Sequence, residues 1–347
     1  MSQAVLDVRR WAEPHRRDRT MSITGAVVAG VATVAGPTEG RGPLGAKFDE
    51  VTPDHLLGCR TWEQAESALV RRAFTQLSAK LGWREGDFDL LLAGDLLDQT
   101  VASSFAARDL DIPLLGLFSA CGTFAEGLGL AALLCSSGAC RRVLVTTSSH
   151  HDTAERQYRF PTELGNQRPP TAQWTATGAV AVAVTRTEEA SGPRITAFTP
   201  GRVMDFGVRD PFQMGGAMAP AAADTLSVHL VALGLAPEDF SIVCTGDLGR
   251  VGVAICEDLL ERGGMRVKLR DCGQELYDPS HQDVHAGGSG AACSALVFAA
   301  KLLGELGPGG ARRLCLCGTG SLHSPTTYQQ GASIPAVAHA VTVEAAG

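Results

Sequence analysis

A cysteine in the string SACGT (119–123) is the residue best placed for chemistry. The stretch Pro113–Phe118 before it reads as a β-strand, and the Ala-, Leu- and Gly-rich residues after it predict a helix. Cys121 then lies at a helix N-terminus, where the helix dipole and unpaired N–H groups lower the pKa of a thiol and attract anions. The spacing predicts a nucleophile or an anion cradle at Cys121, and a buried structural cysteine is the alternative.

Two other polar groups invite a metal or acid–base interpretation. His150, His151 and Asp152 are consecutive, but neighbouring side chains rarely point the same way, and calcium needs six or more oxygen ligands. We therefore expect a pair of loop histidines satisfied by hydrogen bonds, and no metal site. Asp95 and Asp247 follow two similar apolar runs. They form either a carboxylate pair or caps on backbone N–H groups, and the second interpretation is favoured.

The elements that must position these residues occur twice. Three short strings, LG, DF and GDL, recur in the same order 152 residues later. Each copy reads as a helix that ends at a glycine, then a turn and a short buried strand. The glycines are Gly82 and Gly234, and the strands are expected at Leu90–Ala93 and Ile242–Thr245.

A second repeat relates RRVLV (141–145) to RRLCL (312–316), each after a helix of small residues expected at Ala125–Cys135 and Ala291–Leu303. The sequence therefore predicts an α/β fold made of two duplicated halves, 22–190 and 191–343, as two sheets packed about a pseudo-twofold axis with helices between them. A Rossmann cofactor domain and a P-loop are excluded, because neither glycine motif occurs in its required context.

Composition limits the possible partners. The chain has 347 residues, 45% of them apolar, and a net charge of −7 without a basic stripe, which argues against nucleic acid. The apolar runs are shorter than the roughly 18 residues of a membrane helix. The ten cysteines are scattered, so we expect reduced thiols and no disulfide framework or zinc site. Residues 1–21 are expected to be a disordered or over-annotated leader, with Met1 or Met21 as the start.

Three strings together resemble the thiolase superfamily. They are SACGT (119–123) between a strand and a helix, HAGGSG (285–290) and CGTGS (317–321). The resemblance implies a thiolase-like five-layer α-β-α-β-α fold. It also matches Cys121 to the acyl-accepting cysteine of thiolases and β-ketoacyl synthases, and the two glycine-rich loops to those that bring a base, a second cysteine or backbone groups to it.

Longer strings identify one branch, the stage V sporulation protein AD family, over about residues 22–343. They are GPTEGRGPLG (36–45), AGDLL (93–97), TSSH (147–150), TAERQ (153–157), FPTE (160–163) and MAPAAADT (218–225). The resemblance implies a protein that binds dipicolinic acid, or its calcium chelate, and serves its uptake into the developing spore. It implies other SpoVA proteins as partners, peripheral association with the inner spore membrane, and a homodimer.

The catalytic set of the superfamily is incomplete here. The loop TGDLG (245–249) has no His or Asn, and Asp247 is a poor donor to an oxyanion and disfavours a thiolate. We therefore expect a non-catalytic binding protein without a cofactor. The alternatives are a Cys-dependent acyltransferase or β-ketoacyl synthase with Cys121 as nucleophile and His285 as base, and a purely structural adaptor.

A flat aromatic dicarboxylate needs two sets of donors and an apolar slot. Backbone N–H groups at the Cys121 helix and guanidinium groups suit carboxylates, although the arginines are equally explained by pairing with Glu155 and Glu163. The expected ligand-binding residues are Ser119, Cys121, Gly122, Thr123, Arg156, Arg159, His285 and Gly288.

Overall fold

The computed structural model describes residues 18–158, 168–307 and 309–346. Its strands repeat one order in the two halves of the chain. In the first half the order is β5 (Leu114–Gly116), β4 (Leu90–Gly94), β6 (Arg142–Ser149), β8 (Gly178–Arg186) and β2 (Ala26–Ala35). In the second it is β11 (Arg270–Asp271), β10 (Ile242–Thr245), β13 (Arg313–Ser321), β14 (Ala336–Glu344) and β9 (Arg194–Thr199).

Strand directions repeat as well. The first three strands of each half are parallel and the last two antiparallel to their neighbours, so the duplication expected from the sequence is confirmed at the level of topology. The strands expected at Leu90–Ala93 and Ile242–Thr245 are the central β4 and β10. The helix ends at Gly82 and Gly234 are also confirmed, since both glycines have positive φ, 70° and 63°.

The two sheets are joined at one point, which differs from the expected pair of separate sheets. Val27 of β2 pairs with Arg194 of β9, and the result is one 12-stranded sheet. The short connection between β8 and β9 causes this contact. It holds Pro193 beside β2, where the Val28 N–H donates to the Pro193 carbonyl at 2.9 Å.

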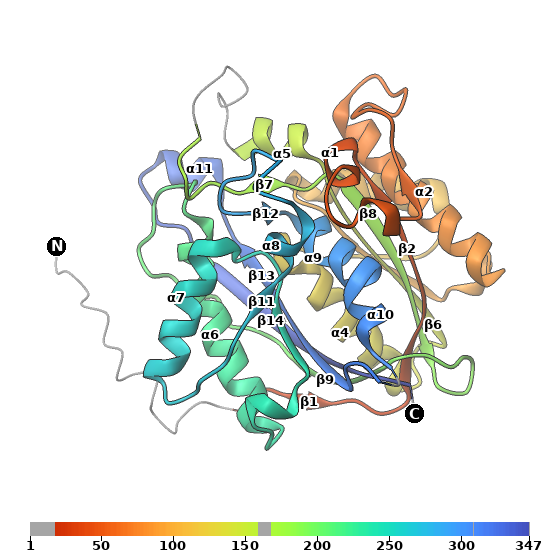
Figure 1. Cartoon of the computed structure of the whole chain (residues 1–347). Helices are drawn as coiled ribbons and strands as arrows, with labels where there is room; N and C mark the ends of the chain where they lie inside the picture. The colour runs from red at the N-terminus through yellow and green to blue at the C-terminus, as the bar shows by residue number, and fades with distance from the viewer. Residues whose placement is uncertain (1–17, 159–167, 308, 347) are drawn as a thin grey trace.

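Helices separate and cover the halves in five layers (Figure 1). In the middle, α4 (Thr123–Ser136) packs between β6 and β8 on one side and β13 and β14 on the other, beside α9 (Ala291–Val297). On the outside, α2 (Trp62–Leu81) and α3 (Val101–Leu110) cover the first half, and α6 (Met214–Ala232) and α7 (Gly249–Arg262) cover the second. The helices expected at Ala125–Cys135 and Ala291–Leu303 are confirmed, the second continuing from α9 through a π-turn, Phe298–Leu302.

Strand β8 illustrates how sequence sets the layers. Its Ala179, Ala181 and Ala183 face α2 in one core cluster, whereas Val180, Val182 and Val184 face the central helices in another. Both faces are buried, so the strand reads as an uninterrupted apolar run rather than an alternating one. The small alanines on the outer face of β8 let α2 approach closely, and the larger valines on its inner face fill the central layer.

Short elements complete the chain. They are β1 (Met21–Ser22), α1 (Pro37–Gly40), β3 (Glu50–Val51), α5 (His151–Tyr158), β7 (Trp174–Thr175), α8 (Cys272–Leu276), β12 (Gly288–Ser289), α10 (Leu303–Glu305) and α11 (Pro325–Gln329). All ten cysteines are free thiols, as the sequence predicts. Within the described ranges, every helix is too short or too polar to cross a bilayer.

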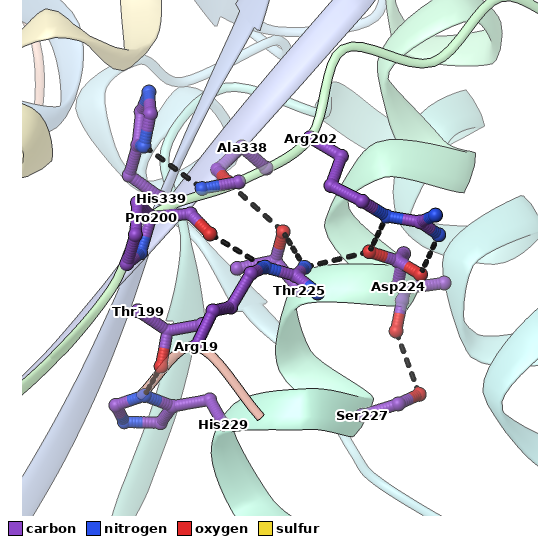
Figure 2. Close-up of polar contacts among 12 residues, drawn as sticks. Arg19, Thr199, Pro200, Arg202, Asp224, Thr225, Ser227, His229, Ala338 and His339 are labelled. Atoms are coloured by element: carbon purple, nitrogen blue, oxygen red, sulfur yellow. Dashed lines mark hydrogen bonds and ion pairs between the residues drawn. The ribbon is translucent and has the colours of Figure 1, made fainter. Parts of the chain in front are cut away.

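Part of the expected leader is packed against the second half. Residues 1–17 lie outside the described residues, but Arg19 donates to the Pro200 carbonyl and to the Asp224 carboxylate, each at 2.6 Å. Figure 2 shows Arg202 reaching the same carboxylate, at 2.8 Å. The interpretation of 18–21 as leader is therefore wrong, because a buried carboxylate of α6 needs the charge that Arg19 supplies.

Candidate functional site

Cys121 sits in the turn that links β5 to α4. Residues Ala120–Gly122 form one 3₁₀ turn directly before the helix, so Cys121 lies at the helix N-terminus, as the sequence predicts. Ala120 adopts positive φ, 50°, an uncommon conformation for a residue with a side chain. The turn makes Cys121 buried, with 5% of its surface exposed.

The backbone donors expected to bind a carboxylate are already used. The Gly122 N–H donates to the Ser119 carbonyl at 3.0 Å, and the Thr123 N–H donates to the Ala120 carbonyl. The Thr123 hydroxyl also turns back to the Ala120 carbonyl, at 2.7 Å. The expectation for Gly122 and Thr123 is therefore wrong in this conformation, because the 3₁₀ turn closes on itself before the helix starts.

A glycine of β13 allows the second half to press against this turn. A Cβ on Gly320 would lie 2.0 Å from the Ser119 carbonyl oxygen and 3.1 Å from the Gly122 nitrogen. The string CGTGS thus brings backbone to the Cys121 turn, as expected, while its own thiol stays apart. Cys317 is buried among the apolar residues of α6 and α7.

The Cys121 thiol faces a buried carboxylate. Its sulfur lies 3.7 Å from the Ser289 hydroxyl, which donates to Asp247 at 2.9 Å. Asp247 also accepts from the Gly290 N–H at 3.1 Å and from the Thr319 hydroxyl at 2.7 Å. Burial, followed by the charge of Asp247, raises the pKa of the Cys121 thiol well above its ordinary value. The effect of Asp247 thus has the predicted direction, and burial is the larger cause.

Ser119 faces away from the thiol. The Gly201 N–H donates to Nδ1 of His339 at 3.1 Å, so the ring carries its proton on Nε2. Nε2 donates to the Ser119 hydroxyl at 3.0 Å, and this hydroxyl donates to Glu126 at 2.7 Å. Burial lowers the pKa of His339 to about 4, which keeps the ring neutral. Ser119 is thus committed to a structural chain of hydrogen bonds.

A small cavity opens on the other side of Cys121. Its volume is about 30 Å³, and it combines apolar walls with hydroxyl groups and one imidazole. Its lining residues are Leu96, Ala120, Cys121, Ala154, Tyr158, Thr175, Met214, Ser289, Ser321 and His323. The buried Ser321 hydroxyl has no hydrogen-bond partner among the residues that the structure describes. An unpaired buried hydroxyl is costly, and it marks the place where a ligand group or water would be bound.

The glycine-rich loop 285–290 reaches the site only at its end. Gly288 and Ser289 form β12, and the Gly288 carbonyl accepts from the Gln173 side chain at 2.9 Å. His285 lies on the rim of this loop, where its Nε2 is 3.1 Å from the exposed Asp283 carboxylate. The structure thus brings Gly288 beside Cys121 through Ser289, but not the imidazole of His285.

Arg156, one of the two expected arginines, is not among the residues that line the cavity. Arg156 pairs with Glu63 of α2, and its guanidinium lies over the Trp62 ring, 5.2 Å from the ring centroid. The alternative of structural pairing thus describes Arg156, although the partner is a residue of another helix and not Glu155 or Glu163. Arg159 lies outside the described residues.

The expected hydrogen bonding is confirmed for His150, and the expected capping of backbone N–H groups is confirmed for Asp95. Both ring nitrogens of His150 make hydrogen bonds, and His151 turns away to stack on Trp174, with centroids 3.6 Å apart. Asp95 caps the N–H groups of Leu97 and Ser103, at 2.9 and 2.8 Å. Asp247 accepts from one backbone N–H group, that of Gly290, and from the hydroxyls of Ser289 and Thr319.

Sequence reasoning missed Ser289, Ser321, His323 and Tyr158. Ser289 and Ser321 belong to the two glycine-rich strings, so the signal was present but was attributed to backbone and base. Tyr158 directly follows the string TAERQ that contains Arg156, and the ring of His323 lies 5.6 Å from that of Tyr158. Nothing in their spacing links these two residues to Cys121.

A larger hollow lies apart from Cys121, between α2 and α3. Its volume is about 490 Å³, and its lining includes Cys59, Phe105 and the guanidinium groups of Arg71 and Arg108. Both arginines pair with Asp109, at 3.0 and 2.7 Å. Size alone would favour this hollow, but both guanidinium groups already contact the Asp109 carboxylate.

The sequence of the chain matches one family of known proteins. The model of the family described as stage V sporulation protein AD (SpoVAD) matches residues 17–344. The stage V sporulation protein AD of Bacillus subtilis (strain 168) is 44% identical over 322 residues, which cover 92% of this chain and 94% of that protein.

Solved structures with the same fold are much more distant in sequence. A variant of OleA from Xanthomonas campestris is 18% identical, with a TM-score of 0.60 over 93% of this chain and 99% of that one. The 3-oxoacyl-[acyl-carrier-protein] synthase III of Aquifex aeolicus VF5 is 14% identical, with a TM-score of 0.57 over 92% and 100%. The likeness confirms the thiolase-like fold.

Proposed function

Because the chain belongs to the stage V sporulation protein AD family, we propose that it is a non-catalytic binding protein for dipicolinic acid or its calcium chelate. In this proposal it serves the uptake of the ligand into the developing spore. The family resemblance supplies the identity of the ligand. The chemistry of the Cys121 cavity supplies the location.

The unpaired Ser321 hydroxyl carries the choice of site. Dipicolinate is a flat ring with two carboxylates, so it needs apolar walls and hydrogen-bond donors. Leu96 and Met214 offer the walls, and Ser321 offers a buried donor that gains a partner when a carboxylate enters. Tyr158 and His323 extend the polar lining on the same side.

The state of the thiol favours binding over catalysis. An acyl-accepting cysteine reacts as its thiolate, whereas burial and Asp247 keep Cys121 protonated. His285, the base of the acyltransferase alternative, pairs with Asp283 on the rim of its loop. Acyl transfer would therefore need a different base and an uncovered thiol.

Ligand entry requires the wall of the cavity to move. A volume of about 30 Å³ is close to that of one water molecule and far below that of a pyridine dicarboxylate. Ala154 and Tyr158 form one wall from α5, and Met214 forms another from the start of α6. The proposal therefore includes an outward shift of α5 on binding.

Calorimetric titration with dipicolinate tests the proposal. Isophthalate, which lacks the ring nitrogen, serves as the matched ligand. Saturable, selective binding that weakens in Cys121→Ala and Ser321→Val supports it, and Cys59→Ala, which removes a thiol from the larger hollow, should bind like the wild type. Absence of heat at millimolar ligand, or loss of binding in Cys59→Ala alone, contradicts it.

Acyl transfer is tested on the same protein. Incubation with an acyl-CoA followed by mass spectrometry of the Cys121 peptide should give no adduct. An adduct that Cys121→Ala abolishes would replace the binding proposal with the enzyme alternative. Neither adduct nor ligand binding would favour a structural adaptor.

The exposed edge of the first sheet supports a homodimer. Strand β5 ends the sheet, and 53% of Leu115 and 48% of Phe118 are exposed there. An uncovered apolar strand edge is a ready pairing surface for a second copy. The proposal also includes other SpoVA proteins as partners at the inner spore membrane, which co-purification from sporulating cells would test.

A further inference from the structure

Three side chains with metal-ligating atoms meet on the outer side of α5. His55 comes from the loop between β3 and α2, His150 follows β6, and Asp152 belongs to the first turn of α5. The Asp152 Oδ2 atom lies 3.3 Å from His55 Nδ1 and 3.7 Å from His150 Nδ1. One donor atom from each residue lies within 4.8 Å of the other two.

The His150 ring is fixed as metal-binding histidines usually are. Its Nε2 lies 2.7 Å from the His55 backbone carbonyl, which can only accept, so Nε2 carries the ring proton. The lone pair on Nδ1 then points toward Asp152, where it accepts a long hydrogen bond of 3.2 Å from the Asp152 N–H. A backbone carbonyl that orients one ring nitrogen is the usual outer-shell arrangement of metal sites, and an ion at Nδ1 would replace the long hydrogen bond from the Asp152 N–H.

The two distances from Asp152 to the histidines are close to those around a small tetrahedral ion. Zinc with bonds of about 2.0–2.1 Å to nitrogen and oxygen places neighbouring ligands about 3.3 Å apart. One of the observed pairs has this separation and the second exceeds it by little. His55 is 33% and Asp152 29% exposed, so an ion can enter from solvent and keep a water molecule as its fourth ligand.

We propose that His55, His150 and Asp152 bind one divalent transition-metal ion of the zinc class. Two imidazoles and one carboxylate favour zinc over calcium and magnesium, which prefer shells of oxygen. The ion would join the 52–60 loop to the start of α5, the helix that also carries Ala154 and Tyr158 of the Cys121 cavity. The site is independent of the proposed ligand.

Sequence reasoning did not anticipate this site. The expectation that His150 and His151 diverge is correct, but His55, 95 residues before His150, takes the place of His151. The prediction of no metal site considered only neighbours in the sequence.

Metal titration of the full chain tests the inference. Chelator-treated protein is titrated with Zn²⁺ against a chromophoric chelator and with Co²⁺ by visible absorption, without dipicolinate, which itself binds metals. We expect one equivalent, with a cobalt spectrum of nitrogen and oxygen ligands and no thiolate charge-transfer band. His55→Gln and Asp152→Asn should each weaken binding at least about tenfold.

A matched control is available in another His–Asp pair. His281 Nδ1 lies 2.8 Å from Asp278 Oδ2 on an exposed loop outside the three-residue cluster, so His281→Gln should bind like the wild type. Both test positions are partly exposed, and circular dichroism verifies that the variants are folded. Equal affinity in the wild type and the two variants, a thiolate-dominated cobalt spectrum, or no stoichiometric binding would overturn the inference.

Discussion

Arg19 lies 2.6 Å from the Asp224 carboxylate, an ion pair between residues 205 positions apart. Asp224 is 1% exposed, and it receives Arg19 on one side and Arg202 on the other (Figure 2). Arg19 is itself only 16% exposed, whereas Arg202 is 59% exposed. The segment before β1 is therefore anchored to α6 by a largely buried charge.

Arg19→Ala should destabilise the protein by about 2 kcal/mol, because a buried carboxylate loses a charged hydrogen bond. Arg202→Ala should cost less than about 1 kcal/mol, since exposed pairs contribute little. Urea unfolding measures both. A larger loss in Arg202→Ala than in Arg19→Ala would contradict the assigned order.

Cys121 should be slow to alkylate. Burial and Asp247 raise the pKa of its thiol, so labelling by iodoacetamide at about pH 8 should lag behind that of the less buried Cys59 and Cys140. Asp247→Asn removes the charge and should raise the rate, about tenfold for each pKa unit recovered. Peptide mass spectrometry resolves the ten thiols.

A matched variant separates charge from packing in this experiment. Ser289→Ala removes the hydroxyl between the thiol and the carboxylate but keeps the charge of Asp247. In this variant the alkylation of Cys121 should stay as slow as in the wild type. Rapid labelling of Cys121 in the wild type would show that the thiolate is accessible and would favour the acyltransferase alternative.

Glu66 should make stability fall with rising pH. Burial, followed by nearby Asp95, raises its pKa to about 8 from an ordinary 4.5. The folded protein therefore holds a proton that the unfolded chain releases near pH 4.5, and this contribution is lost as the pH rises through about 8.

Glu66→Gln keeps the shape of the protonated side chain without the titration. Between about pH 6 and about pH 9 the free energy of unfolding should fall more steeply in the wild type than in this variant. Urea unfolding at both values provides the comparison. Parallel curves would mean that Glu66 does not hold the proton.

The exposed β5 edge should control oligomeric state. Leu115→Arg places a charge on the strand edge and should convert a dimer into a monomer in sedimentation experiments. Val231, which is 71% exposed on α6, supplies the control, because Val231→Arg should leave the mass unchanged. A wild-type chain that is monomeric at micromolar concentration would refute the dimer.

Local sequence was enough to place Cys121 but not its neighbours. The strand-turn-helix pattern gave the position of the thiol correctly, and Asp247 was correctly expected to oppose its ionisation. The free N–H groups at Gly122 and Thr123 were predicted wrongly, because whether a helix starts directly or through a closed 3₁₀ turn depends on packing. Here that packing is the approach of Gly320 to the Ser119 carbonyl.

The sequence by itself determined the duplicated α/β architecture, the central strands and the family, because each rests on short-range patterns and recurring strings. The tertiary structure alone decided which distant side chains meet. It paired Arg156 with Glu63, brought Ser289 and Ser321 to Cys121, and set His55 against His150 and Asp152. Such contacts join residues from different strands and loops, and their geometry is fixed only when the layers pack.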